Sequence, residues 1–381
     1  MYAEIDLGAI EHNVAALRGS LTGGAEVMAV VKANAYGHGA VRAARAALAG
    51  GATWLGVHVP DEGVQLRQAG LTCPILILGY APPWEADKVV FYSLTPTVNN
   101  LQQALALAGA AARRGTDVPV HVKVDTGLSR YGLPPEEVTD FVRSLTAIPH
   151  LRWEGFWTHF ATADEVDKTF AYQQLETYVQ SLRRLEEAGL RPRYRHAANS
   201  AATLDLPEAH FDLVRCGIAI YGLYPSAEVR RTVPLRPALA LKSRVARLRR
   251  LPAGSGIGYG RTFVAEREVT AALVPGGYAD GLRRSLSNLG QVLVRGRRAR
   301  IVGRVSMDQV VVDVTDIPAV EHDDEVVFLG RQGEDGISAE ELGAWMGTIN
   351  YEVVTSISPR VPRVYVRAGE VVAVETMVEE V

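Results

Sequence analysis

The feature that most constrains the fold is a regular alternation of short apolar runs with longer amphipathic stretches. It extends from residue 26 to about residue 223. The predicted strands are 26–32, 53–59, 74–79, 92–97, 118–124, 151–158, 193–197 and 212–220. Between them, apolar residues recur at three- and four-residue spacing in predicted helices such as 61–69, 98–114, 135–147 and 165–189. Eight strand–helix alternations predict an α/β fold with an N-terminal (β/α)8 TIM-like barrel, and a doubly wound open sheet is the alternative.

The weakest of these strand predictions is 92–97. It contains Pro96, which has no backbone N–H to donate to a neighbouring strand. A proline therefore argues against a central position in the sheet.

After residue 234 the pattern changes to short β-branched runs separated by turn residues. The predicted strands are 239–248, 269–274, 291–294, 299–302, 310–314, 325–329 and 363–366, and the one good helix is 338–346, with Ser338 and Glu341 at capping-box spacing. The barrel should be followed by a mostly antiparallel β domain. We expect residues 1–233 to form the barrel and residues 234–381 the β domain, with residues 1–12 as a segment able to pair with the second domain.

Composition and charge exclude several classes of protein. The 381 residues are 48% hydrophobic and 22% charged, with a net charge of −3, which gives no reason to expect a nucleic acid or membrane partner. No apolar run reaches the roughly 18 residues of a membrane span, and the charged N-terminus lacks the apolar core of a signal peptide. Cys73 and Cys216 show no metal-ligand spacing. We expect a cytoplasmic protein without a metal.

Lys32 ends the first apolar run and is followed by a Tyr-Gly-His-Gly segment and an Ala-rich helix. A lysine at the end of a barrel strand places an amine at the mouth of the barrel. Partial desolvation lowers the pKa of such an amine, which can then form a Schiff base with a carbonyl compound. The simpler alternative is a lysine that only reaches for water.

Polar residues follow the later strands as well, where a barrel carries its catalytic groups. They are Lys123, Asp125, Arg130, His159, Asp164, His196, Asn199, Ser200, Arg215 and Gly217. Each has a plain alternative, such as a helix N-cap for Asn199 and Ser200 or a core histidine for His196. Together, however, Ser200 and the amides of Gly217 and Ile218 would form an anion cradle suited to a phosphate. A phosphate cradle near a Schiff-base lysine indicates pyridoxal 5′-phosphate.

The second half contributes a glycine-rich segment around Tyr259, Gly254-Ser-Gly-Ile-Gly-Tyr-Gly-Arg-Thr262. It lacks the strand-before, helix-after context of a phosphate-binding loop, and tyrosine replaces the lysine of that motif. The glycines more plausibly allow a close approach that presents the phenol, although a flexible hairpin is the simpler alternative. Further polar clusters lie at 276–281, 302–309 and 349–352.

These motifs closely resemble those of alanine racemase, a pyridoxal-phosphate enzyme built from a barrel and a C-terminal β domain. The most specific segments are Val30-Val-Lys-Ala-Asn-Ala-Tyr-Gly-His-Gly39, Ile257-Gly-Tyr-Gly-Arg261 and Ser306-Met-Asp-Gln309. The resemblance runs from Ala3 to the Ser358-Pro-Arg-Val-Pro-Arg segment, so it covers almost the whole chain.

The resemblance implies a role for each matching residue. Lys32 would hold the cofactor, and Arg130 would contact the cofactor phenolic oxygen. Arg130 and Met307 would hold the substrate carboxylate, and Lys123 would be carbamylated. Tyr259 would reach the cofactor of the other subunit of a homodimer with shared active sites, oriented by His159. The remaining cofactor-binding residues would be Tyr36, His196, Asn199, Ser200, Arg215, Gly217, Ile218 and Tyr351, and the entrance would be lined by Asp164, Tyr278, Arg284 and Arg304.

The chain departs from the family pattern in two places. Ser306 stands where many relatives carry cysteine, and the segment Gly281-Leu-Arg-Arg284 replaces an aromatic residue and a proline. Because the second departure lies in the segment that carries Arg284, the match to the family pattern is weaker for this residue.

The resemblance implies an interconversion of L-alanine and D-alanine that would supply bacterial peptidoglycan. Lys32 and Tyr259 would serve opposite faces of the α-carbon, and both need pKa values below their usual values of about 10 to act as bases near neutral pH. The alternatives are a racemase of other or broader amino-acid specificity, a non-catalytic cofactor-binding barrel, and a decarboxylase sharing this barrel. A decarboxylase would need a cysteine motif that the chain lacks.

Overall fold

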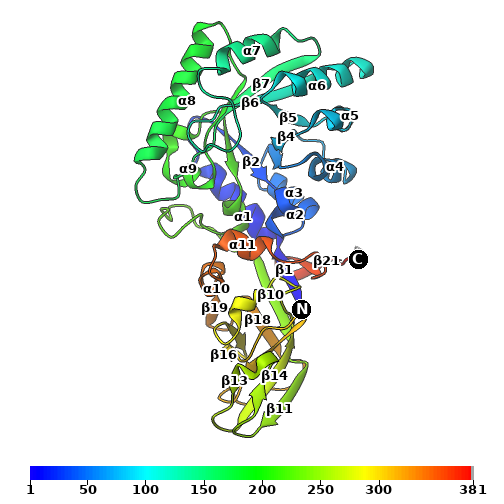
Figure 1. Ribbon diagram of the computed structural model, residues 1–381, viewed down its shortest axis with the longest axis vertical. Coiled ribbons are helices and arrows are strands. Elements are labelled where there is room, and N and C mark those ends of the chain that lie inside the picture. The colour runs from blue at the N-terminus through cyan, green and yellow to red at the C-terminus, as the bar shows by residue number, and fades with distance from the viewer. Residues whose placement is uncertain (379–381) are drawn as a thin grey trace. The chain divides into compact units, whose positions relative to one another are not determined.

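The computed structural model describes residues 1–378, and the chain divides into two compact units (Figure 1). The barrel unit consists of residues 9–35 and 40–236. The β unit consists of Met1–Gly8, Tyr36–Gly39 and the chain from Pro237 onward. Each unit is therefore assembled from segments far apart in the sequence.

Within residues 9–236, all of which the structure describes, eight strands form one parallel sheet in the order β8-β7-β6-β5-β4-β3-β2-β9. The strands are β2 (Glu26–Val30), β3 (Trp54–Val57), β4 (Ile75–Tyr80), β5 (Thr95–Val98), β6 (Val118–Lys123), β7 (Leu151–Trp157), β8 (Tyr194–His196) and β9 (Leu213–Cys216). The end strands β8 and β9 approach closely, since Asp212 N donates to Arg195 O at 3.0 Å and Arg215 N to Ala198 O at 2.9 Å. The sheet is thus a nearly closed barrel, which confirms the predicted fold class over the open doubly wound sheet.

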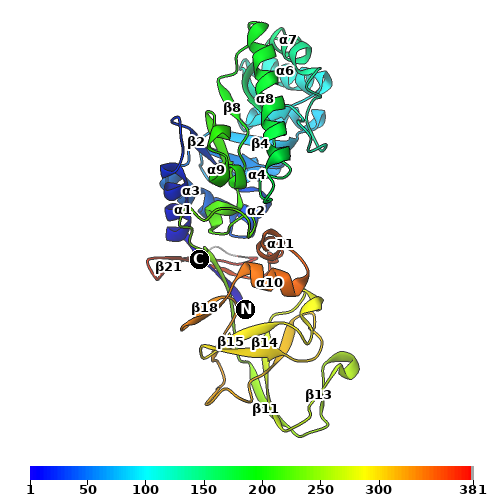
Figure 2. The ribbon, with the colours of Figure 1, turned by 90° about the vertical axis from the view of Figure 1, so that its left-hand side faces the viewer.

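Helices accompany the barrel strands (Figures 1 and 2). They are α1 (Leu7–Gly19), α3 (Ala40–Ala49), α4 (Pro60–Gln68), α5 (Ala86–Phe91), α6 (Leu101–Arg114), α7 (Val138–Thr146), α8 (Thr169–Glu187) and α9 (Ser200–Asp205), with 3-10 turns η1 (Pro83–Glu85), η2 (Pro207–Ala209) and η3 (Ile218–Tyr221). Local sequence fixes the ends of α6. The Asn100 side chain accepts from Gln103 N at the start, and Gly115 takes a φ of 62° at the end.

The predictions for strands β5 and β9 were wrong in detail. Strand β5 begins at Thr95, and Pro96 lies in the middle of the sheet, paired with Ile77. The missing N–H is tolerated because the register shifts between Ile77 and Tyr80, and because the Thr97 hydroxyl donates to Ile77 O at 2.7 Å. Strand β9 stops at Cys216, so the rest of the predicted 212–220 strand is a 3-10 turn.

In the described part of the β unit, the larger sheet has eleven strands in the order β11-β14-β17-β16-β15-β18-β10-β1-β20-β21, with β19 paired to β18. They are β1 (Tyr2–Asp6), β10 (Leu239–Arg244), β11 (Arg247–Leu251), β14 (Val269–Pro275), β15 (Gln291–Val294), β16 (Arg297–Ile301), β17 (Gln309–Asp313), β18 (Glu325–Gln332), β19 (Asp335–Ile337), β20 (Arg363–Arg367) and β21 (Glu370–Glu375). Among these strands only β1 and β20 pair in parallel, so the prediction of a mostly antiparallel domain is confirmed.

The predicted strand 239–248 is divided into β10 and β11, which pair with different neighbours. The rest of the unit comprises the small β12–β13 hairpin (Gly256–Ile257 and Phe263–Val264), the helices α10 (Ala339–Met346) and α11 (Asn350–Thr355), and the 3-10 turns η4 (Tyr259–Arg261) and η5 (Arg284–Leu286).

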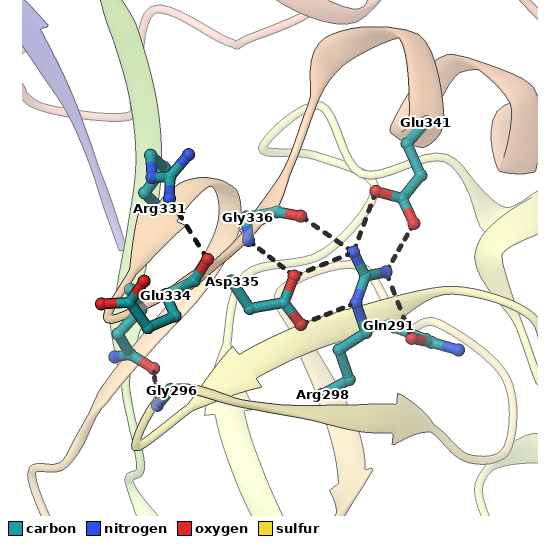
Figure 3. A network of polar contacts seen from close by, with 9 residues as sticks. Gln291, Gly296, Arg298, Arg331, Glu334, Asp335, Gly336 and Glu341 are labelled. Atoms are coloured by element: carbon teal, nitrogen blue, oxygen red, sulfur yellow. Dashed lines mark hydrogen bonds and ion pairs between the residues drawn. The ribbon is translucent and has the colours of Figure 1, made fainter.

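Helix α10 is tied to the sheet through Arg298 of β16 (Figure 3). The Ser338 hydroxyl accepts from Glu341 N at 3.1 Å, which confirms the predicted N-cap. The Glu341 carboxylate accepts from Arg298 Nη2 at 3.2 Å, and the Asp335 carboxylate from Arg298 Nε at 3.0 Å. One guanidinium therefore joins β16, β19 and the first turn of α10.

Residues 1–378 lack two features, a membrane-spanning helix and a cluster of metal ligands. They contain no helix long and apolar enough to cross a membrane. They also contain no group of three or more His, Cys, Asp or Glu side chains arranged to hold a metal ion.

Candidate active site

Lys32 lies two residues beyond β2 and begins a left-handed turn, α2 (Lys32–Tyr36). The φ angles of Ala33, Asn34, Ala35 and Tyr36 are 53°, 51°, 53° and 52°. Left-handed backbone costs a non-glycine residue roughly 1–2 kcal/mol. The predicted strand 26–32 thus overran by two residues, because alanine and asparagine give no glycine signal for a left-handed turn.

Two side chains in the barrel unit hold this turn. Glu62, on α4, accepts from Ala33 N at 2.6 Å and from His58 N at 2.6 Å through its two carboxylate oxygens. Asn34 accepts from Ala40 N at 2.8 Å and so caps helix α3. Glu62 was not among the predicted site residues, because a carboxylate in the first turn of a helix is common and has no distinguishing local signal.

The Lys32 amine has a lowered pKa. Burial lowers its pKa, the Arg130 charge lowers it further, and Glu62 opposes both. Burial, Lys32 and Arg130 likewise lower the pKa of His58. Burial and the Arg130 charge thus both lower the pKa of Lys32, the direction predicted for a partly desolvated lysine.

Arg215, on β9, is the centre of a buried polar cluster and is 3% exposed. It donates to the carbonyls of Thr158, Ala197 and His196 at 2.7, 2.9 and 3.0 Å. Its guanidinium also lies 3.1 Å from His196 Nδ1 and 3.2 Å from His159 Nδ1. Burial lowers the pKa of Arg215 to about 9, and burial followed by the Arg215 charge lowers the pKa values of both histidines.

Lys123 lies beside this cluster, against the ring of Trp157. The Lys123 amine and the Arg215 guanidinium carbon each lie 4.7 Å from the centre of that ring. Burial lowers the pKa of Lys123 from 10.5 to about 7, with further lowering by Arg215 and Arg130 and opposition from Asp125. Trp157 was not predicted as a site residue, because a tryptophan within a strand most often belongs only to the hydrophobic core.

Ser200 and Gly217 are in direct contact, since Ser200 Oγ accepts from Gly217 N at 2.9 Å and from Ala219 N at 3.4 Å. The Gly217 amide thus donates to Ser200, and the anion cradle stays a prediction. Ser200 and Ile218 are both buried. Asn199 accepts from Ala202 N at 3.0 Å, so its side chain is the N-cap of α9. The backbone carbonyl of Asp164 accepts a hydrogen bond from the Ser226 hydroxyl at 2.5 Å.

In the β unit, Tyr259 lies on η4 with 72% of its surface exposed. Gly258 and Gly260 flank it with φ angles of 73° and 69°. A Cβ at Gly258 would lie 2.9 Å from Arg304 N, and one at Gly260 would lie 3.2 Å from Arg304 Nη1. The glycines therefore permit both the backbone turn and the close approach of Arg304, as predicted for a segment that presents a phenol.

The other predicted residues of the β unit form two pairs, and Arg284 lies apart from both. Tyr278 and Met307 lie on adjoining backbone, where Tyr278 N donates to Ser306 O and Ala279 N to Met307 O, both at 3.0 Å. Tyr36 and Tyr351 are ring neighbours, with centroids 6.2 Å apart. Arg284 begins η5, and its carbonyl accepts from the Ser287 hydroxyl at 2.5 Å, a contact that involves no other predicted site residue.

Two family models match the chain, alanine racemase N-terminal domain over residues 5–225 and alanine racemase C-terminal domain over residues 238–365. Alanine racemase of Carboxydothermus hydrogenoformans is 47% identical over 96% of this chain and 99% of its own, and that of Symbiobacterium thermophilum is 48% identical over 96% of each. Alanine racemase of Clostridium difficile 630 superposes with a TM-score of 0.94 at 38% identity, over 98% of each chain. The Bacillus anthracis structure with bound L-Ala-P has a TM-score of 0.93 at 41% identity, over 99% of this chain and 97% of its own.

Proposed function

Because the chain belongs to the alanine racemase family of isomerases, we propose that it uses pyridoxal 5′-phosphate to interconvert L-alanine and D-alanine, with Lys32 and Tyr259 as the two proton-transferring groups. The observation that carries this proposal is the Lys32 amine at the end of β2, whose pKa is lowered by burial and by Arg130. A lysine prepared in this way can bind a carbonyl group and can accept a proton.

The donor groups of the barrel unit fit this cofactor. Lys32, Lys123 and Arg215 are largely buried, and the charges of Arg215 and Arg130 lower the pKa of their lysine neighbours. An anionic ligand would relieve this repulsion. Ser200 accepts hydrogen bonds from two amides, which leaves its own proton to donate to a phosphate oxygen.

When bound, pyridoxal phosphate supplies an electron sink that acidifies the α-hydrogen of the amino acid. The residues of this chain would bind and orient. Lys32 would hold the cofactor through its amine, and Arg215, supported by His196, would face the pyridine nitrogen. The other groups are those inferred from the family resemblance: Tyr36, Asn199, Ser200, Gly217, Ile218 and Tyr351 for the cofactor, Arg130 and Met307 for the substrate carboxylate, and Asp164, Tyr278, Arg284 and Arg304 for the entrance.

Proton transfer would use two bases on opposite faces of the α-carbon. Lys32 Nζ would remove or return the proton on one face, and Tyr259 Oη on the other. The exposure of Tyr259, at 72%, supports its use by a second copy of the chain in a homodimer with shared active sites, where His159 would orient it. We also retain the prediction of a cytoplasmic enzyme that supplies D-alanine for peptidoglycan.

Carbamylation of Lys123 is the second chemical proposal for the site. Only an unprotonated amine reacts with carbon dioxide, and a pKa of about 7 leaves much of this amine unprotonated at neutral pH. The resulting anion would lie among the cations that now repel the lysine. Native mass spectrometry in bicarbonate and in carbonate-free buffer should differ by one bound carbon dioxide, and Lys123→Met should abolish the difference.

The activity is tested with L-alanine in heavy water. Wild-type protein loaded with cofactor should exchange the α-hydrogen and lose optical rotation, whereas Lys32→Ala and Tyr259→Phe should each lose most of the racemisation. The matched control is Tyr172→Phe, at another exposed tyrosine outside the proposed site. Absence of both signals in the wild type would end the racemase proposal, and a panel of other amino acids measures how strictly alanine is preferred.

Sharing of the active site is tested by mixing the two inactive variants. A hybrid of one Lys32→Ala subunit and one Tyr259→Phe subunit contains one site in which both bases are intact, if each site takes its tyrosine from the partner. Activity should therefore return on mixing. No recovery, with hybrid dimers verified by mass, would show that each chain uses its own tyrosine.

A further inference from the structure

His121, on β6, is a fully buried histidine for which the proposed reaction has no use. Its ring lies among aromatic neighbours in the barrel, with centroids 5.4 Å from Trp54 and 6.3 Å from Tyr194. Its Nδ1 lies 3.0 Å from His196 Nε2. His196 in turn contacts Arg215, so the two imidazoles and the guanidinium form one continuous chain.

The positions of the protons on the two imidazole rings follow from the contact with Arg215. A guanidinium only donates, so His196 Nδ1 must be the unprotonated acceptor. Since burial and the Arg215 charge keep His196 neutral, its single proton is on Nε2. That proton is donated to His121 Nδ1, which must also be unprotonated.

This series of hydrogen bonds, from Arg215 through His196, ends at His121. The proton of neutral His121 has to be on Nε2, and in residues 1–378 this buried nitrogen has no hydrogen-bond partner. A buried N–H without an acceptor is destabilising. The arrangement therefore satisfies His196 and Arg215 at the expense of His121.

The neighbouring strand makes room for this ring. Gly155, on β7, is paired with His121, and a Cβ at Gly155 would lie 2.4 Å from both Cε1 and Nδ1 of the imidazole. An alanine there would force the ring to move. The position of the His121 acceptor thus depends on the absence of a side chain at residue 155.

We propose that His121 is a positioning residue: by accepting from His196 Nε2, it fixes the His196 tautomer that presents an unprotonated Nδ1 to Arg215, and so holds the guanidinium. Its effect on catalysis rests on the proposed function, in which Arg215 faces the cofactor. The tautomers of His121 and His196 do not depend on turnover. The tautomer assignment and its effect on catalysis can therefore each be refuted without the other.

Nitrogen NMR of protein labelled with ¹⁵N-histidine tests the chain directly. In the wild type, both His196 and His121 should be neutral with the proton on Nε2 between about pH 5.5 and 8.5, since burial lowers the pKa of His121 to about 3. The His121→Leu variant removes the acceptor, and the His196 Nε2–H signal should shift or be lost. Protonation of His196 on Nδ1 in the wild type would overturn the proposal.

Activity variants provide the second test. His121→Leu should lower kcat about 10-fold with little change in KM, because the lost hydrogen bond acts on the position of Arg215. His121→Asn keeps an oxygen near the place of Nδ1 and should recover most of that loss. Exposed His322→Leu is the matched control and should be unchanged. Equal losses for Leu and Asn, in variants with wild-type circular dichroism, would contradict a role as acceptor.

If His121→Leu does not fold, Gly155→Ala keeps the imidazole and displaces it, and the same NMR signals decide. Unchanged His196 signals in Gly155→Ala, despite the displaced ring, would contradict the proposal. A protein with the expected tautomers but no racemisation would refute the proposed function and leave the tautomer assignment of His121 and His196 intact.

Discussion

Replacing Lys123 by methionine tests the buried amine quantitatively, because methionine keeps most of the apolar stem and removes the titrating group. The pKa of Lys123 falls from 10.5 to about 7 in the folded chain, mainly through burial. At about 1.4 kcal/mol per pKa unit, this corresponds to about 5 kcal/mol between the two limits of pH.

The sign of the pH dependence follows from proton binding. Between pH 7 and 10.5 the unfolded chain holds the Lys123 proton and the folded chain does not, so the free energy of unfolding rises with pH in this range. Below pH 7 both states are protonated and the folded state carries the full penalty. From about pH 6 to pH 9.5 the wild type should gain about 3 kcal/mol relative to Lys123→Met.

The measurement is urea unfolding of both proteins across this pH range, followed by tryptophan fluorescence, with Trp54 and Trp157 as reporters in the barrel. Protein concentration is held constant, and the buffers are free of carbon dioxide because carbamylation would remove the titrating amine. Parallel pH profiles for the two proteins would refute the assignment of a buried amine with a depressed pKa. Addition of bicarbonate should then flatten the wild-type profile and leave Lys123→Met unchanged.

Three further substitutions probe contacts outside the reacting groups. Tyr178→Phe removes a hydroxyl that donates to Phe156 O at 2.7 Å and accepts from His196 N at 3.1 Å, so it should lower the free energy of unfolding by about 1–3 kcal/mol in urea titrations. Arg298→Met leaves two carboxylates of the β unit without their shared partner and should cost about 0.5–1 kcal/mol, measured in the same way; no change would show that the network in Figure 3 is only a solvated surface contact. Glu62→Gln keeps one carbonyl oxygen but loses the second acceptor at the Lys32 turn, and hydrogen exchange of the Ala33 amide should accelerate about 10-fold, with exposed Asp61→Asn as the unchanged control.

The barrel could be predicted from the sequence because its strands are continuous apolar runs at regular spacing, and because parallel strands are buried on both faces. Pro96 shows where this reasoning fails. Propensity excludes a proline from a central strand, yet a register shift and the Thr97 hydroxyl compensate for the missing donor. Such compensation depends on a neighbouring strand and has no local signal.

The candidate site likewise has features with a local sequence signal and features without one. Lys32, Ser200 and Arg215 were singled out because they follow or end barrel strands, and their roles stay predictions; the structure does bring Ser200 into contact with Gly217 and Arg215 into contact with His196. The left-handed turn after Lys32 and the contact from His121 to His196 could not be predicted, since each depends on a partner from another strand or helix. Trp157 and Gly155 lie inside a strand, where a large apolar residue and a glycine have many ordinary explanations.

Strand β1 has a consequence for how the protein is made. It lies inside the β-unit sheet, with Tyr2 opposite Lys242 on one side and Ala3 opposite Arg363 on the other. At synthesis rates of about 5–20 residues per second, the first strand leaves the ribosome roughly 20–70 s before its second neighbour exists. Both edges of β1 therefore lack a partner until β10 is made, and one edge still lacks its partner until β20 is made, when translation is almost complete.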